Sequence, residues 1–186
     1  MHRSKAVMLG LMVLSSATMT EAQEPSESSF ALGLSSYATV FSVDTYKGSD
    51  EFRFGGAAIN ATLSLNNNLA LRGHLYSQEW EDASSTELSG FDLQLLLGSN
   101  LAREGFKYYL SLGLFSEELE EPGYSRSLSG TMIGFGLGYN WERVALDFSL
   151  HARQAQPYAD MLEELGYPYS GTVSAGSGAL SLAYRF

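Results

Sequence analysis

The sequence predicts an all-β fold: an eight-stranded antiparallel up-and-down transmembrane β-barrel, preceded by a cleavable signal peptide. Three observations lead to this prediction. The chain ends in an alternating stretch, its first residues follow the pattern of a secretory signal, and eight segments alternate apolar with small or polar side chains. An extended strand sends alternate side chains to opposite faces, so each such segment has one apolar face.

The N-terminal segment 1–22 has three parts. A short basic stretch comes first, the apolar run 6–14 follows, and small and polar residues come last. This order is typical of a secretory signal peptide, and the run is too short to span a bilayer. We place cleavage after Ala22, with Ala17 as the rival site, and assign residues 23–186 to the barrel domain.

Eight segments alternate in character and are bounded by turn residues. Most are near or above the roughly 9–11 residues that a tilted strand needs to cross a bilayer. The sequence leaves the register of the first two strands open, and Gly55 and Gly56 predict a bulge or bend in the second. The predicted strands are 30–43, 52–65, 69–78, 88–98, 106–116, 128–140, 144–153 and 171–186.

The connections between these strands alternate in length. Short turns are predicted at 66–68, 99–105 and 140–143, and longer connections at 44–51, 79–87, 117–127 and 154–170. Outer-membrane barrels combine short periplasmic turns with long extracellular loops, so both barrel ends should be exposed in this way. The long connections hold most of the acidic residues: Asp44, Asp50, Glu51, Glu79, Glu81, Asp82, Glu87, Glu117, Glu118, Glu120, Glu121, Asp160, Glu163 and Glu164.

The polar face of the strands separates a membrane barrel from a soluble one. A soluble barrel should carry many Lys and Glu on the face that meets water, whereas this face carries small residues such as Ser111, Gly134 and Ser149. Small side chains suit the narrow lumen of an eight-stranded barrel. We expect a polar network inside this lumen, because charges away from bulk water need partners. Its predicted members are Arg72, His74, Asp92, Gln94, Asp147, His151 and Arg153.

The last strand carries the most specific signal. Leu180, Leu182, Tyr184 and Phe186 share one face, and the two aromatic rings would anchor the strand at the membrane boundary. The mature chain resembles small eight-stranded outer-membrane proteins of the OmpA transmembrane-domain and OmpX type. The resemblance implies that Leu182, Tyr184 and Phe186 form the signal read by the bacterial barrel-assembly machinery.

Composition excludes several classes of function. The chain has no cysteine, so it can hold neither a disulfide nor a thiolate metal site. Its net charge of −10 argues against nucleic acid as a partner. We expect no cofactor and no metal site, because the acidic runs lack the spaced ligands and glycine of a calcium loop.

One strand carries the three residue types of a hydrolase triad. Asp147, Ser149 and His151 share a face of segment 144–153. Neighbours on one face lie roughly 6.5–7 Å apart at Cα, longer than a direct Ser–His hydrogen bond comfortably allows. We therefore favour a structural role for these residues in the lumen network.

The last long connection offers a second candidate site. Tyr158, Met161, Leu162 and Leu165 would share one face of a short helix. Such an apolar patch marks either a partner site or a segment that folds over the barrel mouth, and we favour the second arrangement.

The sequence therefore favours a monomeric, non-enzymatic outer-membrane protein that serves envelope integrity, surface interaction or adhesion. Its predicted partners are outer-membrane lipid and lipopolysaccharide, the barrel-assembly machinery, and an extracellular partner that the sequence does not specify. The alternatives are a lipid A- or phospholipid-modifying enzyme and, with less support, a small pore, because eight strands leave little open lumen.

Overall fold

The structure, a computed structural model, describes residues 29–46, 48–167 and 171–186. The predicted signal peptide 1–22 and both of its candidate cleavage sites lie outside these residues. In chain order the elements are β1 (Phe30–Thr45), β2 (Gly48–Ser64), β3 (Leu69–Trp80), β4 (Ala83–Ser99), β5 (Gly105–Glu121), β6 (Tyr124–Asn140), β7 (Val144–Arg153), α1 (Gln156–Glu164) and β8 (Val173–Arg185).

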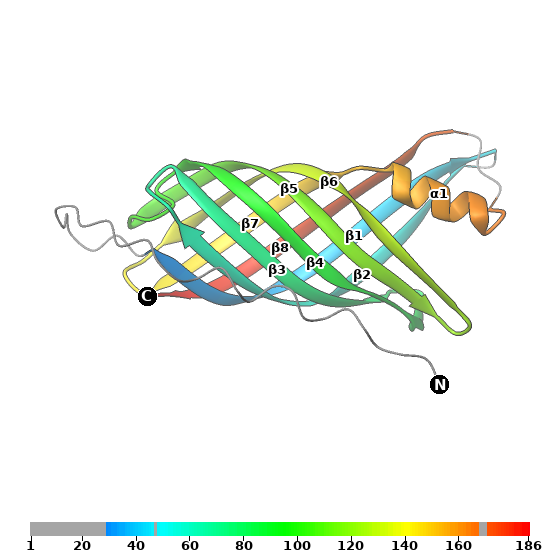
Figure 1. Cartoon of the computed structure of the whole chain (residues 1–186), viewed down its shortest axis with the longest axis horizontal. Helices are drawn as coiled ribbons and strands as arrows, with labels where there is room; N and C mark the ends of the chain where they lie inside the picture. The colour runs from blue at the N-terminus through cyan, green and yellow to red at the C-terminus, as the bar shows by residue number, and fades with distance from the viewer. Residues whose placement is uncertain (1–28, 47, 168–170) are drawn as a thin grey trace.

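The strands form one closed barrel in sequence order. Each strand pairs antiparallel with the next, and β8 closes the barrel by pairing with β1. Figure 1 shows the strands tilted along a long barrel, with α1 at one end and the C-terminus at the other. We call these the α1 end and the terminal end. The predicted eight-stranded up-and-down barrel is confirmed.

The first two strands pair without interruption. The register runs from Phe30 opposite Leu63 to Thr45 opposite Gly48. The bulge predicted at Gly55 and Gly56 is therefore wrong. Glycine serves a different purpose there, because a Cβ atom added at Gly56 would come within 2.0 Å of the carbonyl oxygen of Ser77. The register shifts instead between Glu79 and Trp80, where β3 meets β4.

Three of the predicted long connections are strand rather than loop. The segments 44–51, 79–87 and 117–127 continue the flanking strands into hairpins, so that Thr45 pairs with Gly48 and Glu121 with Tyr124. Apolar alternation stops where these strands leave the apolar belt, but backbone pairing does not, and the sequence alone therefore placed their ends too early. The connection 154–170 differs, because it contains α1.

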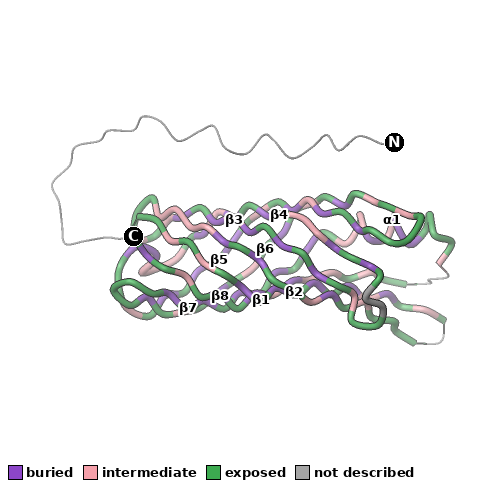
Figure 2. Tube along the Cα trace, turned by 90° about the horizontal axis from the view of Figure 1, so that it is seen from below, coloured by how far each residue is buried: buried purple, intermediate pink, exposed green. Residues whose placement is uncertain are grey.

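The two faces of each strand separate as predicted. Along β7 the exposed side chains Val144, Leu146, Phe148 and Leu150 alternate with the buried residues that face the lumen. Figure 2 shows the same alternation of exposed and buried positions around the barrel. In the described ranges no helix has the length and apolar character needed to cross a membrane.

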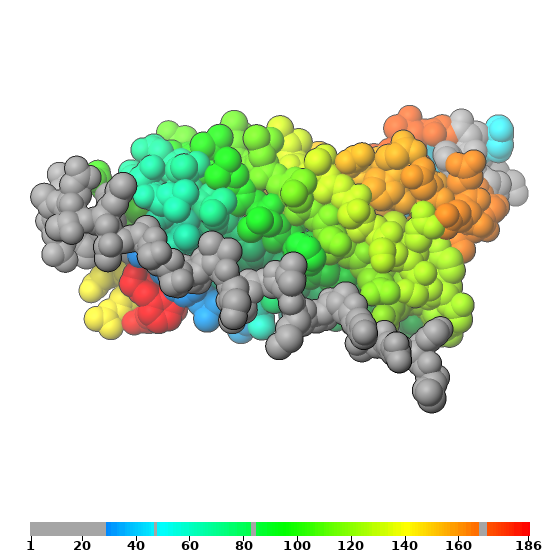
Figure 3. Space-filling model, in the orientation of Figure 1, coloured from blue at the N-terminus to red at the C-terminus, as the bar shows by residue number. Residues whose placement is uncertain are grey.

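An apolar cluster fills the barrel at the α1 end. Tyr158, Met161 and Leu162 of α1 are buried in it with inward residues of the strands, among them Phe41, Leu88, Phe115, Leu119 and Leu128. Figure 3 shows α1, in orange, beside the β5–β6 hairpin in yellow-green. Arg126 of that hairpin pairs with Glu164 of α1. The helix therefore caps the lumen, and polar side chains occupy the barrel below it.

Candidate functional site in the lumen

Three buried carboxylates follow one another along the lumen. Glu117 of β5 lies nearest the α1 end, Asp92 of β4 in the middle and Asp147 of β7 toward the terminal end. Each is 3% exposed or less. A buried charge is strongly destabilising without partners, so the surroundings of each carboxylate decide what the lumen does.

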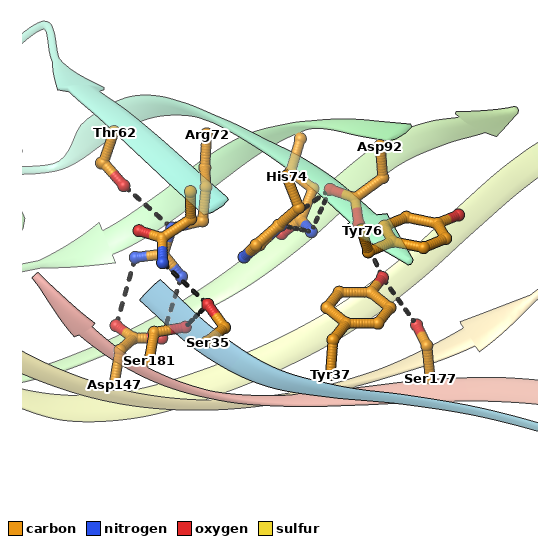
Figure 4. Close-up of polar contacts among 12 residues, drawn as sticks. Ser35, Tyr37, Thr62, Arg72, His74, Tyr76, Asp92, Asp147, Ser177 and Ser181 are labelled. Atoms are coloured by element: carbon orange, nitrogen blue, oxygen red, sulfur yellow. Dashed lines mark hydrogen bonds and ion pairs between the residues drawn. The ribbon is translucent and has the colours of Figure 1, made fainter. Parts of the chain in front are cut away.

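Asp147 lies between two cations. Arg72 donates to it through both terminal nitrogens, at 2.8 and 3.2 Å, and the Lys107 Nζ lies 2.9 Å from its Oδ2. The Tyr109 hydroxyl donates to Oδ1 at 2.5 Å. Arg72 also donates to Thr62, as Figure 4 shows on its left side. One carboxylate thus serves two positive charges.

Asp92 organises the middle of the lumen. The Tyr37 hydroxyl donates to its Oδ2 at 2.6 Å, and the His74 Nδ1 lies 2.9 Å from its Oδ1. Gln94 donates to the same Oδ1 at 2.8 Å. Figure 4 shows His74 to the left of this carboxylate and Tyr37 below it. The aspartate fixes three neighbouring side chains from three strands.

Glu117 pairs with Arg153 beneath the cap. The Arg153 guanidinium lies 2.6 Å from Oε2, and hydroxyls of Tyr76 and Tyr158 donate to the carboxylate at 2.7 and 2.6 Å. Arg153 also donates to Tyr37, which bonds to Asp92. The two groups nearest the α1 end therefore form one continuous network.

Tyr158 joins this network to α1. Its hydroxyl donates to Glu117 and accepts from Arg153 at 3.0 Å. Burial raises the pKa of the Tyr158 phenol, opposed by the positive charge of Arg153, so the hydroxyl keeps its proton and remains a donor. The helix is thus held on the barrel by both apolar packing and a buried hydrogen bond.

Glycines on β6 make room for these side chains. A Cβ atom at Gly136 would meet the Tyr109 ring at 2.2 Å, and one at Gly134 would meet the His151 ring at 2.3 Å. The predicted stripe of small residues therefore accommodates large side chains that reach across from neighbouring strands.

The terminal end of the lumen is also filled. Arg185 donates to the carbonyl oxygens of Trp141 and Ala102, and Asn140 donates to those of Asn100 and Arg103. A cavity of about 20 Å³ remains, lined by Arg72, Lys107, Asp147 and Arg185 among others, which is room for one or two waters. Side chains therefore occupy both ends of the lumen.

The candidate triad does not form a catalytic relay. Asp147, Ser149 and His151 all face the lumen, but Asp147 is bonded to Arg72, Lys107 and Tyr109. Neither ring nitrogen of His151 has a hydrogen-bond partner among the described residues, so His151 does not contact the Ser149 hydroxyl as a base. Within residues 29–46, 48–167 and 171–186, no group of three His, Cys, Asp or Glu side chains lies close enough together to hold a metal ion.

The predicted lumen network is only partly the network that the structure contains. The pairs Arg72–Asp147 and His74–Asp92 form, and Gln94 joins the second, whereas Arg153 pairs with Glu117. Sequence reasoning placed Glu117 in a loop. The predicted network also lacks Lys107 and the lumen tyrosines. Lys107, Tyr109 and Glu117 are an even number of residues from Ser111 along β5, so they share its inward face. That alternation was the signal that could have found them.

The apolar residues of the last long connection are mostly covered. Tyr158, Met161 and Leu162 pack in the cluster at the α1 end, and Leu165 alone of the four is exposed, at 50%. The four side chains therefore do not form an exposed interaction patch.

Comparison with solved structures finds other small barrels. The attachment invasion locus protein Ail of Yersinia pestis matches with a TM-score of 0.49 and 17% identity, over 84% of this chain and 98% of Ail. A second Ail structure contains the heparin analogue sucrose octasulfate. This chain has in its own right the closed barrel of eight sequential antiparallel strands described above.

Two further solved structures match this chain to a similar extent. Neisserial surface protein A matches with a TM-score of 0.48 and 17% identity, over 83% of this chain and 97% of that protein. The N-terminal β-barrel domain of OprF from Pseudomonas aeruginosa matches with a TM-score of 0.47 and 16% identity, over 84% and 97%. No protein-family model matches the sequence, and no curated protein matches it.

Proposed function

We propose that this chain is a non-enzymatic outer-membrane protein that contacts partners outside the cell through its α1 end. The observation that carries the proposal is how the surface changes along the barrel. An apolar belt surrounds the middle, and hairpins with exposed carboxylates extend past it at the α1 end. The belt suits lipid and the hairpins suit water.

Aromatic side chains mark the other boundary of the belt. Large exposed rings gather where the strands reach the terminal end, at Phe106, Tyr108, Tyr139, Trp141 and Tyr184. Tyr and Trp prefer the interface between lipid and headgroups. The terminal end, with its short turns, then faces the periplasm, and the longer hairpins face outward.

The charge of the α1 end selects its partners. All the acidic residues predicted for the long connections are exposed except Glu117, and Arg53 and Arg126 are each paired with a glutamate. Such a surface favours cationic partners and repels a polyanion of the kind found with Ail. We therefore favour surface interaction or adhesion through cationic groups.

A lipid-modifying enzyme fits the lumen less well. The carboxylate of Asp147 is bonded to two cations, and His151 does not contact Ser149. All three side chains lie inside the barrel, away from lipid. The polar groups act as a scaffold that keeps the narrow barrel filled.

Cysteine labelling on intact cells tests the orientation, because the natural chain has no cysteine. Asp82→Cys lies in the β3–β4 turn at the α1 end, and Glu142→Cys in the β6–β7 turn at the terminal end. A membrane-impermeant maleimide should label the first on intact cells and the second only after the outer membrane is permeabilised. The reverse pattern would overturn the proposed orientation.

A further inference from the structure

The buried charges of the lumen do not cancel. Among the buried residues that the structure describes, three are carboxylates and four are lysine or arginine. The carboxylates are Glu117, Asp92 and Asp147, and the cations are Arg153, Arg72, Lys107 and Arg185. With neutral histidines the lumen therefore carries one surplus positive charge, and a buried charge without a counterion is strongly destabilising.

The surplus lies toward the terminal end. The cavity of about 20 Å³ is lined by a single carboxylate, that of Asp147, and by three cations. Glu104 and Glu142 of the terminal turns are exposed, so water screens their charges. The three cations are Arg72, Lys107 and Arg185.

The Asp147 carboxylate has little capacity left for a third cation. Its two oxygens are contacted by two nitrogens of Arg72, by the Lys107 Nζ and by the Tyr109 hydroxyl. A carboxylate offers about four acceptor positions, and these contacts occupy them. Arg185 donates instead to two backbone carbonyl oxygens, which carry no net charge.

Hydroxyl groups add neutral donors to the cavity lining. Thr62 accepts from the Arg72 Nε at 3.0 Å, so its own hydrogen can be donated to a ligand. Asn60 donates to Ser35, and Ser35 shares a hydrogen bond of 2.7 Å with Ser181. When Ser35 supplies the hydrogen of that bond, Ser181 can donate into the cavity. Figure 4 shows Thr62 above the Arg72 guanidinium and Ser181 below it.

The volume of the cavity limits its ligand. About 20 Å³ accommodates one or two waters, or a single-atom anion of similar size. Phosphate, sulfate and carboxylate ligands are larger. Water would fill the space and leave the surplus charge in place, whereas one monovalent anion would cancel it.

We infer that the cavity at the terminal end of the lumen binds a chloride ion. Lys107, Arg72 and Arg185 supply the positive charge, and the hydroxyls of Thr62 and Ser181 supply neutral donors. An ion that binds the folded barrel and not the unfolded chain stabilises the barrel. This site is independent of what the α1 end contacts and of how the barrel is oriented, so it goes beyond the proposed function.

The test is equilibrium urea unfolding of the mature barrel in lipid vesicles. Chloride replaces gluconate at constant ionic strength, so that screening of the exposed carboxylates stays the same. We expect the unfolding equilibrium constant to fall about tenfold when chloride reaches about ten times its dissociation constant. Bromide should act as chloride does, and sulfate should act as gluconate does, because sulfate does not fit the cavity.

Two variants locate the ion. Lys107→Met removes one buried cation, so that three carboxylates face three cations and the effect of chloride should disappear. Arg143→Met is the matched control, because it removes a positive charge at the same end of the barrel from a side chain that is 70% exposed. This variant should respond to chloride as the natural chain does. Heat-modifiable migration verifies that both variants are folded.

A second measurement needs no variant. The chlorine NMR line of the buffer should broaden in the presence of the folded barrel, because chloride exchanges with a site of low symmetry. Excess bromide should reverse the broadening, and sulfate should not.

Three results would overturn the inference. These are an unfolding constant indifferent to chloride, an effect of chloride that Lys107→Met retains, and a chlorine line that bromide does not sharpen. The first would show that the cavity holds water alone. None of these results bears on the labelling of intact cells, so the site and the proposed orientation fail separately.

Discussion

Replacing Asp147 with asparagine should destabilise the barrel more than any other single change of one lumen carboxylate to its amide. The substitution keeps the shape of the side chain but removes the charge that serves both Arg72 and Lys107, at 2.8 and 2.9 Å. All three side chains are almost fully buried. Two cations would then remain in the lumen without a counterion.

The expected size follows from these contacts. Removing one partner of a buried ion pair costs about 3–5 kcal/mol, because the remaining charge is left unpaired. Weakening the Tyr109 hydrogen bond adds about 1 kcal/mol. Water in the adjacent cavity of about 20 Å³ offsets part of this, so we expect a loss of about 3–5 kcal/mol in total.

The assay is urea unfolding in lipid vesicles, followed by heat-modifiable migration and tryptophan fluorescence. Asp160→Asn, on the exposed face of α1, is the matched control and should stay within about 0.5 kcal/mol of the natural chain. Adding Lys107→Met to Asp147→Asn should recover about 2 kcal/mol, because only one cation then lacks its partner. An Asp147→Asn barrel as stable as the Asp160→Asn control would refute the reasoning.

Three further predictions follow from the same structure. Ser149→Ala and His151→Ala should leave lipid A and phospholipid species unchanged by mass spectrometry; loss of an acylated or deacylated species with either variant would establish the enzyme instead. Replacing both Tyr184 and Phe186 with serine should strongly reduce the amount of assembled barrel in outer-membrane fractions, whereas Arg185→Lys should reduce it less. Normal assembly of the double-serine variant would contradict the proposed assembly signal. Tyr158→Phe removes the hydroxyl that bonds to Glu117 and Arg153, so it should lower the free energy of unfolding by about 1–3 kcal/mol. It should also speed proteolysis within residues 154–170, and unchanged proteolysis would show that apolar packing alone holds α1.

The sequence predicted the parts of this barrel that alternate within one strand. Leu110 and Leu112 face outward and Ser111 inward, as their spacing indicated, and β7 has the predicted bounds. These features depend on the period of an extended strand and on which face meets lipid, and both are local properties of the sequence.

Contacts across the lumen depend on more than local pattern. Arg153 and Glu117 come from strands two places apart in the wall, and their meeting is set by the registers of β5, β6 and β7 together. Glu117 also stands in an acidic run, where alternation is hidden because polar residues occupy both faces. Strand ends were misjudged for the same reason, since the hairpins at the α1 end extend into water without an apolar face.

The central claim is that the outward side chains of this barrel face lipid and the inward ones do not. The most direct measurement places a single cysteine at Leu110, Ser111 or Leu112 of β5 and attaches a fluorophore to each in vesicles of brominated lipid. The account predicts strong quenching at positions 110 and 112 and weak quenching at position 111. Equal quenching at all three, or the strongest quenching at position 111, would contradict it.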